Sequence, residues 1–208
     1  MARKRTRDAA PKTVRPPGRR PVAWLGAAAI SVVILAGVAA VVVTSNAGRP
    51  SGSAPNGERL GVTLVAYQGD ALLGGGRVDL AGVVGRGKPV VLNFFAGLCP
   101  PCRAEMPGFE AAWKRHSDEI ILVGADIGPF LSLGSHEDAR RLLDDLGITY
   151  PAAYVEEDVV ARFNVVGMPT TIFYAAYGRE AGRHTGVLTE EQLESGIRQL
   201  LEASAASR

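Results

Sequence analysis

The chain has 208 residues, which is enough for one domain of ordinary size together with accessory segments. Its net charge of +2 conceals an asymmetry, because residues 1–20 carry a net charge of +7 and the rest of the chain carries −5. The basic excess therefore belongs to the N-terminal tail and gives no support for a nucleic-acid-binding domain. Both cysteines, Cys99 and Cys102, lie in one short motif, which excludes a structural disulfide framework and a four-thiolate zinc site.

An apolar run without charges, residues 22–43, follows the basic tail of residues 1–21. At about 1.5 Å per residue it is long enough to cross a hydrocarbon core of about 30 Å. Trp24 suits the membrane interface, and the excess of positive charge places the tail in the cytoplasm. We predict a single-pass anchor at residues 22–43 in a bacterial cell membrane, with everything after about residue 44 outside the cytoplasm.

A cleaved signal peptide is the alternative interpretation of this run, but its apolar region would usually be only about 7–15 residues. Ser45-Asn46-Ala47 is a weak candidate cleavage site, and no cysteine is present there to carry a lipid anchor. Residues 44–59 are rich in Ser, Gly, Pro and Asn, which is typical of a flexible linker. The soluble domain is then expected at residues 60–208.

Residues 82–88 contain most of a phosphate-binding loop, G-x-x-x-x-G-K. The next residue is Pro89, where such a loop needs Ser or Thr, and the following residues 90–95 predict a buried strand instead of a helix. We therefore expect no nucleotide site, and no cofactor, in this part of the chain.

A helix is predicted after the cysteines, because Met106, Phe109 and Trp113 are spaced as one helical face. Pro107 lies inside this helix and is expected to kink it. The apolar residues 120–125 predict a second buried strand.

A second helix is predicted between Ser135, a plausible N-cap, and Gly147, a stop signal. Residues 170–174 predict a third strand, and residues 182–187 give a weaker signal for a fourth. In the last helix, Thr189 and Gln192 form a capping box. Its buried stripe is expected to consist of Leu193, Ile197, Leu200 and Leu201. Strands that alternate with helices predict an α/β layer fold.

The cysteine motif Cys99-Pro100-Pro101-Cys102 lies between a predicted strand and a predicted helix. At a helix N-terminus, unpaired backbone N–H groups and the helix dipole stabilise a thiolate and lower its pKa. Proline is tolerated in the first helical turn. Cys99 is therefore expected to be the more exposed, attacking sulfur, and Cys102 the sulfur that resolves the mixed disulfide.

The sequence argues against two metal-based alternatives. Half of a zinc site has little support, because no second cysteine pair exists and His116, His136 and His184 are scattered in the sequence. A copper chaperone on the same fold typically spaces its cysteines by three residues and adds a histidine, whereas the spacing here is two. A peroxidase would need a cysteine outside the motif. We therefore expect thiol chemistry and no metal ligands.

The chain resembles the TlpA/ResA-type branch of the thioredoxin-like superfamily in residues 87–96 (GKPVVLNFFA), 99–107 (CPPCRAEMP) and 167–171 (GMPTT). The resemblance implies a thioredoxin fold, with a central mixed sheet flanked by helices and with Pro169 in the cis form. It also implies that Met168 and Pro169 present substrate backbone beside the cysteines, and we assign Pro100 and Pro101 to the same contact surface.

This resemblance further implies a reductant of protein disulfides outside the membrane. The Cys-x-x-Cys-His haem-attachment site of apocytochrome c is a frequent substrate of the branch, and another membrane protein is the expected electron donor. Two departures alter the site. Leu98 stands where an aromatic residue is common, and Asn93 stands where thioredoxins carry a buried acid. We hypothesise that Glu105 replaces that acid as proton acceptor; the alternative is that Glu105 is a solvated helix charge.

Overall fold

The computed structural model describes residues 59–206, and these form one α/β domain. The predicted tail, anchor and linker lie outside the described residues, apart from Arg59 at the end of the linker. Among residues 59–206, none of the helices combines the length and the apolar character that a membrane crossing requires.

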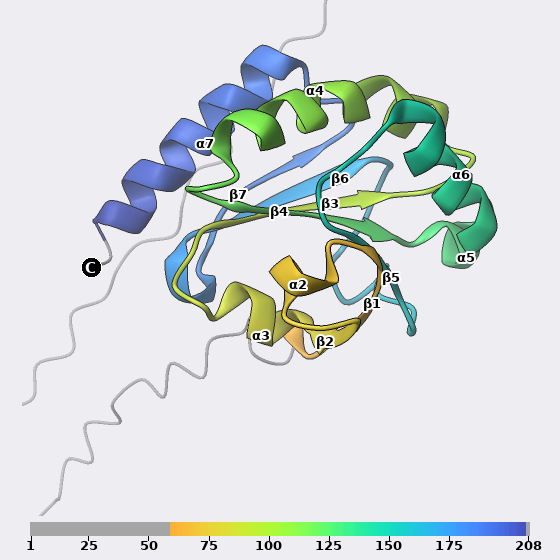
Figure 1. Cartoon of the computed structure of the whole chain (residues 1–208), viewed down its shortest axis with the longest axis horizontal. Helices are drawn as coiled ribbons and strands as arrows, with labels where there is room; N and C mark the ends of the chain where they lie inside the picture. The colour runs from red at the N-terminus through yellow and green to blue at the C-terminus, as the bar shows by residue number, and fades with distance from the viewer. Residues whose placement is uncertain (1–58, 207–208) are drawn as a thin grey trace, which may run out of the picture. The chain divides into compact units, whose positions relative to one another are not determined.

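A seven-stranded mixed sheet forms the centre of the domain, in the order β2-β1-β5-β4-β3-β6-β7 (Figure 1). The strand β3 runs parallel to β4, and β4 runs parallel to β5, whereas the other neighbours are antiparallel. The strands are β1 (Thr63–Gln68), β2 (Arg77–Asp79), β3 (Val90–Phe95), β4 (Ile121–Asp126), β5 (Ala152–Val155), β6 (Thr170–Tyr174) and β7 (Glu180–Thr185).

Helices cover both faces of this sheet, with α4, α6 and α7 on one face and α2 and α3 on the other (Figure 1). The helical segments are α2 (Asp70–Leu73), α3 (Leu80–Val84), α4 (Pro100–His116), α5 (Gly128–Leu131), α6 (His136–Leu146), the 3₁₀ turn η1 (Ala176–Gly178) and α7 (Glu190–Ala205). The α/β layer fold predicted from the sequence is confirmed.

The strand β3 is apolar almost throughout because both of its faces are covered, and all six of its residues are buried. Its side chains alternate between two cores. Val91 and Phe95 pack with α4, α6 and α7, whereas Leu92 and Phe94 pack with α3 and the segment 155–165. Asn93 is the single polar residue of β3 and faces α4, where the site described below is built.

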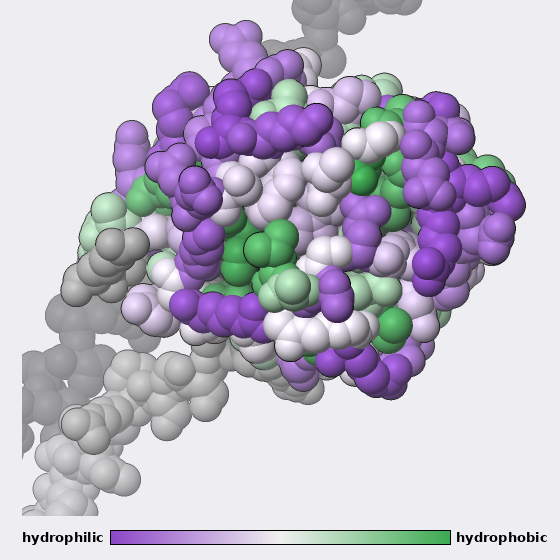
Figure 2. Space-filling view, in the orientation of Figure 1, coloured by the Kyte–Doolittle hydropathy of each residue, from purple (hydrophilic) through white to green (hydrophobic). Residues whose placement is uncertain are grey.

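The helix ends follow the capping signals in the sequence. Ser135 and Asp138 form a capping box at α6, Gly147 ends α6 in the left-handed conformation (φ 62°), and a second capping box begins α7. In α7, Leu193, Ile197 and Leu200 are buried, and Leu201 is half-buried. Hydrophilic side chains gather over α6 and α7 in Figure 2, as expected of helices that bury only one stripe.

The helix α4 continues through Pro107 as one element of 17 residues, so this proline does not end the helix. Two details differ from the sequence-based expectations. The fourth predicted strand, β7, ends at Thr185 because Gly186 turns the chain at φ 99°. The strands β1, β2 and β5 had no clear signal, since β1 is only partly buried and β2 and β5 are very short.

Candidate active site

The two cysteines lie at the N-terminus of α4, directly after the central strand β3. Cys99 is the N-cap residue, and Pro100 and Pro101 occupy the first helical positions, where their missing N–H groups cost nothing. A disulfide of 2.02 Å joins Cys99 to Cys102, so the structure represents the oxidised form. The backbone N–H of Cys102 points at the Sγ of Cys99 at 3.3 Å, which is the arrangement that stabilises a thiolate there after reduction.

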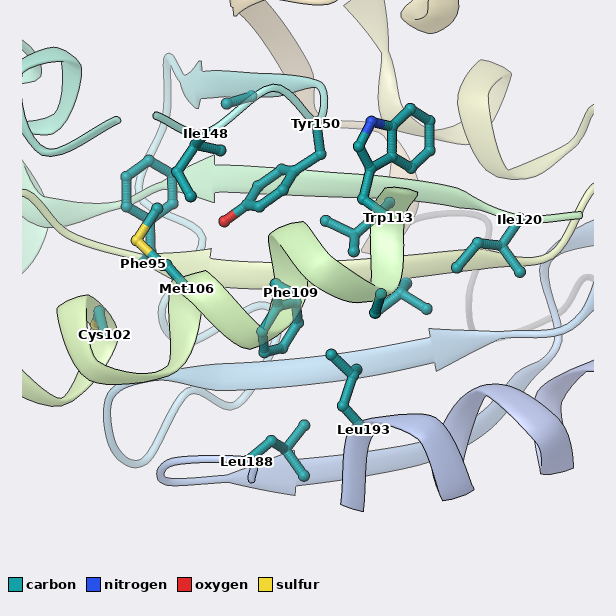
Figure 3. Close-up of a cluster of buried hydrophobic side chains, with 14 of the residues drawn as sticks. Phe95, Cys102, Met106, Phe109, Trp113, Ile120, Ile148, Tyr150, Leu188 and Leu193 are labelled. Atoms are coloured by element: carbon teal, nitrogen blue, oxygen red, sulfur yellow. The ribbon is translucent and has the colours of Figure 1, made fainter. Parts of the chain in front are cut away.

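Both cysteines are buried in the oxidised form, Cys99 with 3% of its surface exposed and Cys102 with none. The small remaining exposure belongs to the cysteine that we predicted to attack. Figure 3 shows Cys102 on α4 together with Met106 and Phe109, and all three belong to the core between α4 and the sheet.

Glu105 is buried beneath this motif, one helical turn after Cys102, and only 3% of its surface is exposed. Its Oε1 accepts a hydrogen bond from Asn93 Nδ2 (2.8 Å), and its Oε2 accepts one from the backbone N–H of Leu188 (2.9 Å). Burial raises the pKa of Glu105 to about 7, although the two donors oppose part of that rise. The alternative of a solvated helix charge is wrong, because the sheet and the start of α7 enclose the carboxyl group.

Asn93 orients that carboxyl group from the sheet. Its Nδ2 also donates to Thr171 Oγ1 (3.1 Å), its neighbour on β6 in the antiparallel register. The Oδ1 of Asn93 is buried and has no hydrogen-bond partner among the described residues. An amide at this position can orient Glu105 but cannot accept a proton from a thiol, so Glu105 is the titratable group of the pair.

The segment before β6 lies at the same end of the sheet as the cysteines. Because β3 and β6 are antiparallel and Phe94 pairs with Thr170, the chain before Thr170 lies beside the chain after Phe95. The Met168–Pro169 peptide bond is cis, as the family resemblance implied. Met168 is partly buried and contacts both cores. The strand register thus brings residues 168–169 to the end of the sheet from which the cysteine motif follows.

Two apolar side chains at this end of the sheet are strongly exposed. Leu98, which precedes the first cysteine, is 61% exposed, and Val166, near the cis-proline, is 75% exposed. The sequence singled out Leu98 but not Val166, because an isolated valine in a loop carries no pattern. The sequence also gave no sign that the backbone N–H of Leu188 donates a hydrogen bond to Glu105.

The phosphate-loop motif and the histidines noted in the sequence have other roles in the structure. Residues 82–88 include the end of α3, and Lys88 donates to the carbonyl of Ser117 (3.0 Å) instead of lining a phosphate loop. Within residues 59–206, His, Cys, Asp and Glu side chains form no group of three or more that could hold a metal ion. His116 is hydrogen-bonded to Glu119 and Glu194, and His136 is hydrogen-bonded to Asp126.

Comparison with known proteins now adds to this geometry. The model of a thioredoxin-like domain family matches residues 77–201. The chain belongs to the thioredoxin-like family. Its resemblance to the ResA-type branch is confirmed by curated relatives that carry the name ResA. The chain is 33% identical over 113 residues to the thioredoxin-like protein YneN of Bacillus subtilis, covering 54% of this chain and 65% of YneN. It is 34% identical over 112 residues to the thiol-disulfide oxidoreductase ResA of Halalkalibacterium halodurans, covering 52% and 60%.

The match thus spans less than two thirds of the length of these curated relatives. Solved structures show the same fold. A secreted Mycobacterium tuberculosis disulfide oxidoreductase homologous to E. coli DsbE superposes with a TM-score of 0.54 at 23% identity, over 68% of this chain and 98% of that one. StoA from Bacillus subtilis gives 0.53 at 20% identity, over 65% and 94%.

Proposed function

We propose that this thioredoxin-like chain is a thiol–disulfide oxidoreductase that reduces disulfides in other proteins. The observation that carries the proposal is the disulfide pair Cys99–Cys102 at the N-terminus of α4, with Cys99 as the N-cap residue and Cys102 in the first turn. Relatives named thiol-disulfide oxidoreductases support the same activity.

The exchange proceeds in two balanced steps. The Cys99 thiolate attacks one sulfur of a substrate disulfide, forming a mixed disulfide and releasing the other substrate sulfur as a thiolate that takes up a proton. Cys102 then loses its proton and attacks the Sγ of Cys99. This step re-forms the Cys99–Cys102 bond and releases the second substrate thiol. Two electrons pass from the cysteine pair to the substrate.

In this mechanism Glu105 accepts the proton of Cys102. A buried thiol needs a nearby base, and a carboxyl group whose pKa is about 7 is well matched to proton transfer near neutral pH. The hydrogen bonds from Asn93 and Leu188 orient the carboxylate and disperse its charge. Asn93 thus has an orienting role in place of the acid that thioredoxins carry on this strand.

The substrate lies across the end of the sheet where the two loops meet. Pro100 and Pro101, which follow Cys99 in α4, and Met168 and Pro169, at the same end of the sheet, form the proposed contact surface. The exposed side chain of Leu98 adds an apolar contact where the family commonly has an aromatic one.

The proposal places this domain outside the cytoplasm, tethered by residues 22–43 through a linker. The basic tail and the apolar run support that topology. The proposed partners are proteins with disulfides, among them the haem-attachment site of apocytochrome c, and an electron donor in the membrane that reduces the pair again. No nucleic acid and no cofactor is involved.

A mixed-disulfide trap tests the proposal. In a Cys102→Ala variant the second step is blocked, so a disulfide between Cys99 and a substrate protein should accumulate, and it should be absent from the matched Cys99→Ala variant. A reduction potential near −270 mV agrees with a reductant, whereas one near −120 mV contradicts that direction. Stoichiometric metal binding without any thiol exchange would contradict the activity itself.

A further inference from the structure

Asp126, the last residue of β4, has a buried carboxyl group that the exchange mechanism does not use. It has no exposed surface. Its Oδ2 accepts a hydrogen bond from Tyr67 OH (2.7 Å) and contacts His136 Nδ1 (2.9 Å), and its Oδ1 accepts one from the N–H of Gly128 (2.9 Å). A buried carboxyl group is costly unless it is hydrogen-bonded or paired, and these three contacts meet that condition.

These contacts lead to the loop that carries the first cysteine. Gly128, bound by Asp126, accepts a hydrogen bond from the N–H of Leu133 (3.0 Å), and the carbonyl of Leu133 accepts the N–H of Leu98 (2.8 Å). Gly128 is also tightly enclosed. A Cβ added there would lie 3.1 Å from Asp126 Oδ1 and 3.2 Å from the Cβ of Ala96. Asp126 is therefore connected to the residue next to the cysteine by three successive hydrogen bonds.

The second set of contacts fixes the start of α6 against the same loop. His136 is the first residue of α6, and its bond to Asp126 ties that helix end to β4. The backbone of this first turn lies directly against Gly97, since a Cβ added at Gly97 would be 2.4 Å from the N of Ala139. Tyr67 completes the group. Burial, followed by its hydrogen bond to Asp126, raises the pKa of Tyr67, so its hydroxyl stays a donor.

We propose that Asp126 is a positioning residue for thiol–disulfide exchange. By holding residues 128–136, it presents the Leu133 carbonyl and the first turn of α6 to residues 96–98, and so fixes the direction in which the Cys99 sulfur faces its partner. This inference rests on the proposed function in one respect, namely that Cys99 is the attacking sulfur. A displacement of about 1 Å at a reacting group can lower a rate by about a hundredfold, so partial loosening should cost about tenfold.

The test compares Asp126→Ala with Glu110→Ala in the full chain. Glu110 is a matched control, because it too is a buried carboxylate that accepts hydrogen bonds from a backbone N–H and a hydroxyl group, both of Thr149. The measurement is the second-order rate constant of the reduced protein with a small aromatic disulfide, 5,5′-dithiobis(2-nitrobenzoic acid), beside the urea midpoint. A small probe removes any effect of substrate docking.

We expect Asp126→Ala to lower this rate constant about tenfold, while Glu110→Ala lowers the urea midpoint but leaves the rate within about twofold. Equal rates for the two variants would overturn the proposal and show that Asp126 serves stability alone. His136→Ala, at a side chain that is 41% exposed, removes one contact of Asp126 and decides the matter if Asp126→Ala does not fold: a slower rate supports the proposal and an unchanged rate overturns it. If Cys99→Ala reacts like the wild type, the proposed function fails instead.

Discussion

The wild-type protein should lose stability as the pH rises, because the buried carboxyl group of Glu105 ionises. Replacement of Glu105 by Gln should remove this loss. The pKa of Glu105 is about 7 in the folded protein and has an ordinary value of 4.5. Between these two values the folded state binds the proton and the unfolded state does not. The contribution of Glu105 to stability is therefore fully present below about pH 4.5 and is lost as the pH rises through 7.

The size of this loss follows from the shift. A difference of one pKa unit corresponds to about 1.4 kcal/mol, so the free energy of unfolding should fall by about 3 kcal/mol between pH 4.5 and pH 8 because of Glu105 alone. Glutamine has a similar shape and does not titrate. The difference in stability between Glu105→Gln and the wild type should thus shift by about 3 kcal/mol in favour of the variant over this range.

The assay is urea unfolding of the oxidised protein at several pH values, with Glu110→Gln as the matched control on the same helix. Burial opposes the ionisation of Glu110, but Thr149 and Lys114 more than compensate and lower its pKa. Its contribution is present above about pH 4.5 and is lost as the pH falls, so its variant should show the opposite trend. A Glu105→Gln difference that does not change with pH would refute the reasoning, and with it the role of Glu105 as a proton acceptor.

Three further predictions concern the surroundings of the site. Gly97→Ala should lower the free energy of unfolding by about 1–3 kcal/mol in urea titrations, because its Cβ would lie 2.4 Å from backbone atoms of α6 that cannot move aside; an unchanged midpoint would contradict this contact. Ser135→Ala should cost about 1 kcal/mol in the same assay, through loss of the capping box, and Ser135→Gly should cost less. Leu98→Asp should slow the reduction of insulin but not of a small disulfide, since Leu98 is 61% exposed beside Cys99; equal slowing of both would place its effect on the thiol instead.

Much of the fold could be predicted from local patterns. The strands β3 and β4 were evident from mostly apolar runs and β6 from β-branched and aromatic residues, and α6 and α7 were evident from capping residues that act within one turn of the chain. In each of these elements, the signal and the structure that it specifies lie in the same few residues. The strands β1 and β5 gave no such signal, because their burial depends on pairing with each other across about 90 residues.

The site was predictable to the same extent. The cysteine pair and the cis-proline segment are contiguous motifs, and both are present as expected. The raised pKa of Glu105 was not predictable, because it comes mainly from burial against elements distant in the sequence, and it is moderated by the backbone N–H of Leu188, 83 residues away. A backbone contact leaves no trace in residue type. The role proposed for Asp126 could not be predicted for the same reason, because the hydrogen bonds that connect it to the cysteine loop involve mainly backbone atoms.

The central claim is that Cys99 and Cys102 pass two electrons to a protein disulfide. Its most direct test is a single turnover, in which the reduced full chain is mixed with an equimolar protein disulfide and both products are analysed by mass spectrometry. The account predicts that the chain loses two hydrogens and forms the Cys99–Cys102 disulfide while the substrate gains two thiols, and that Cys99→Ala forms neither product. A chain that stays reduced, or a Cys99→Ala variant that reduces the substrate equally well, would contradict it.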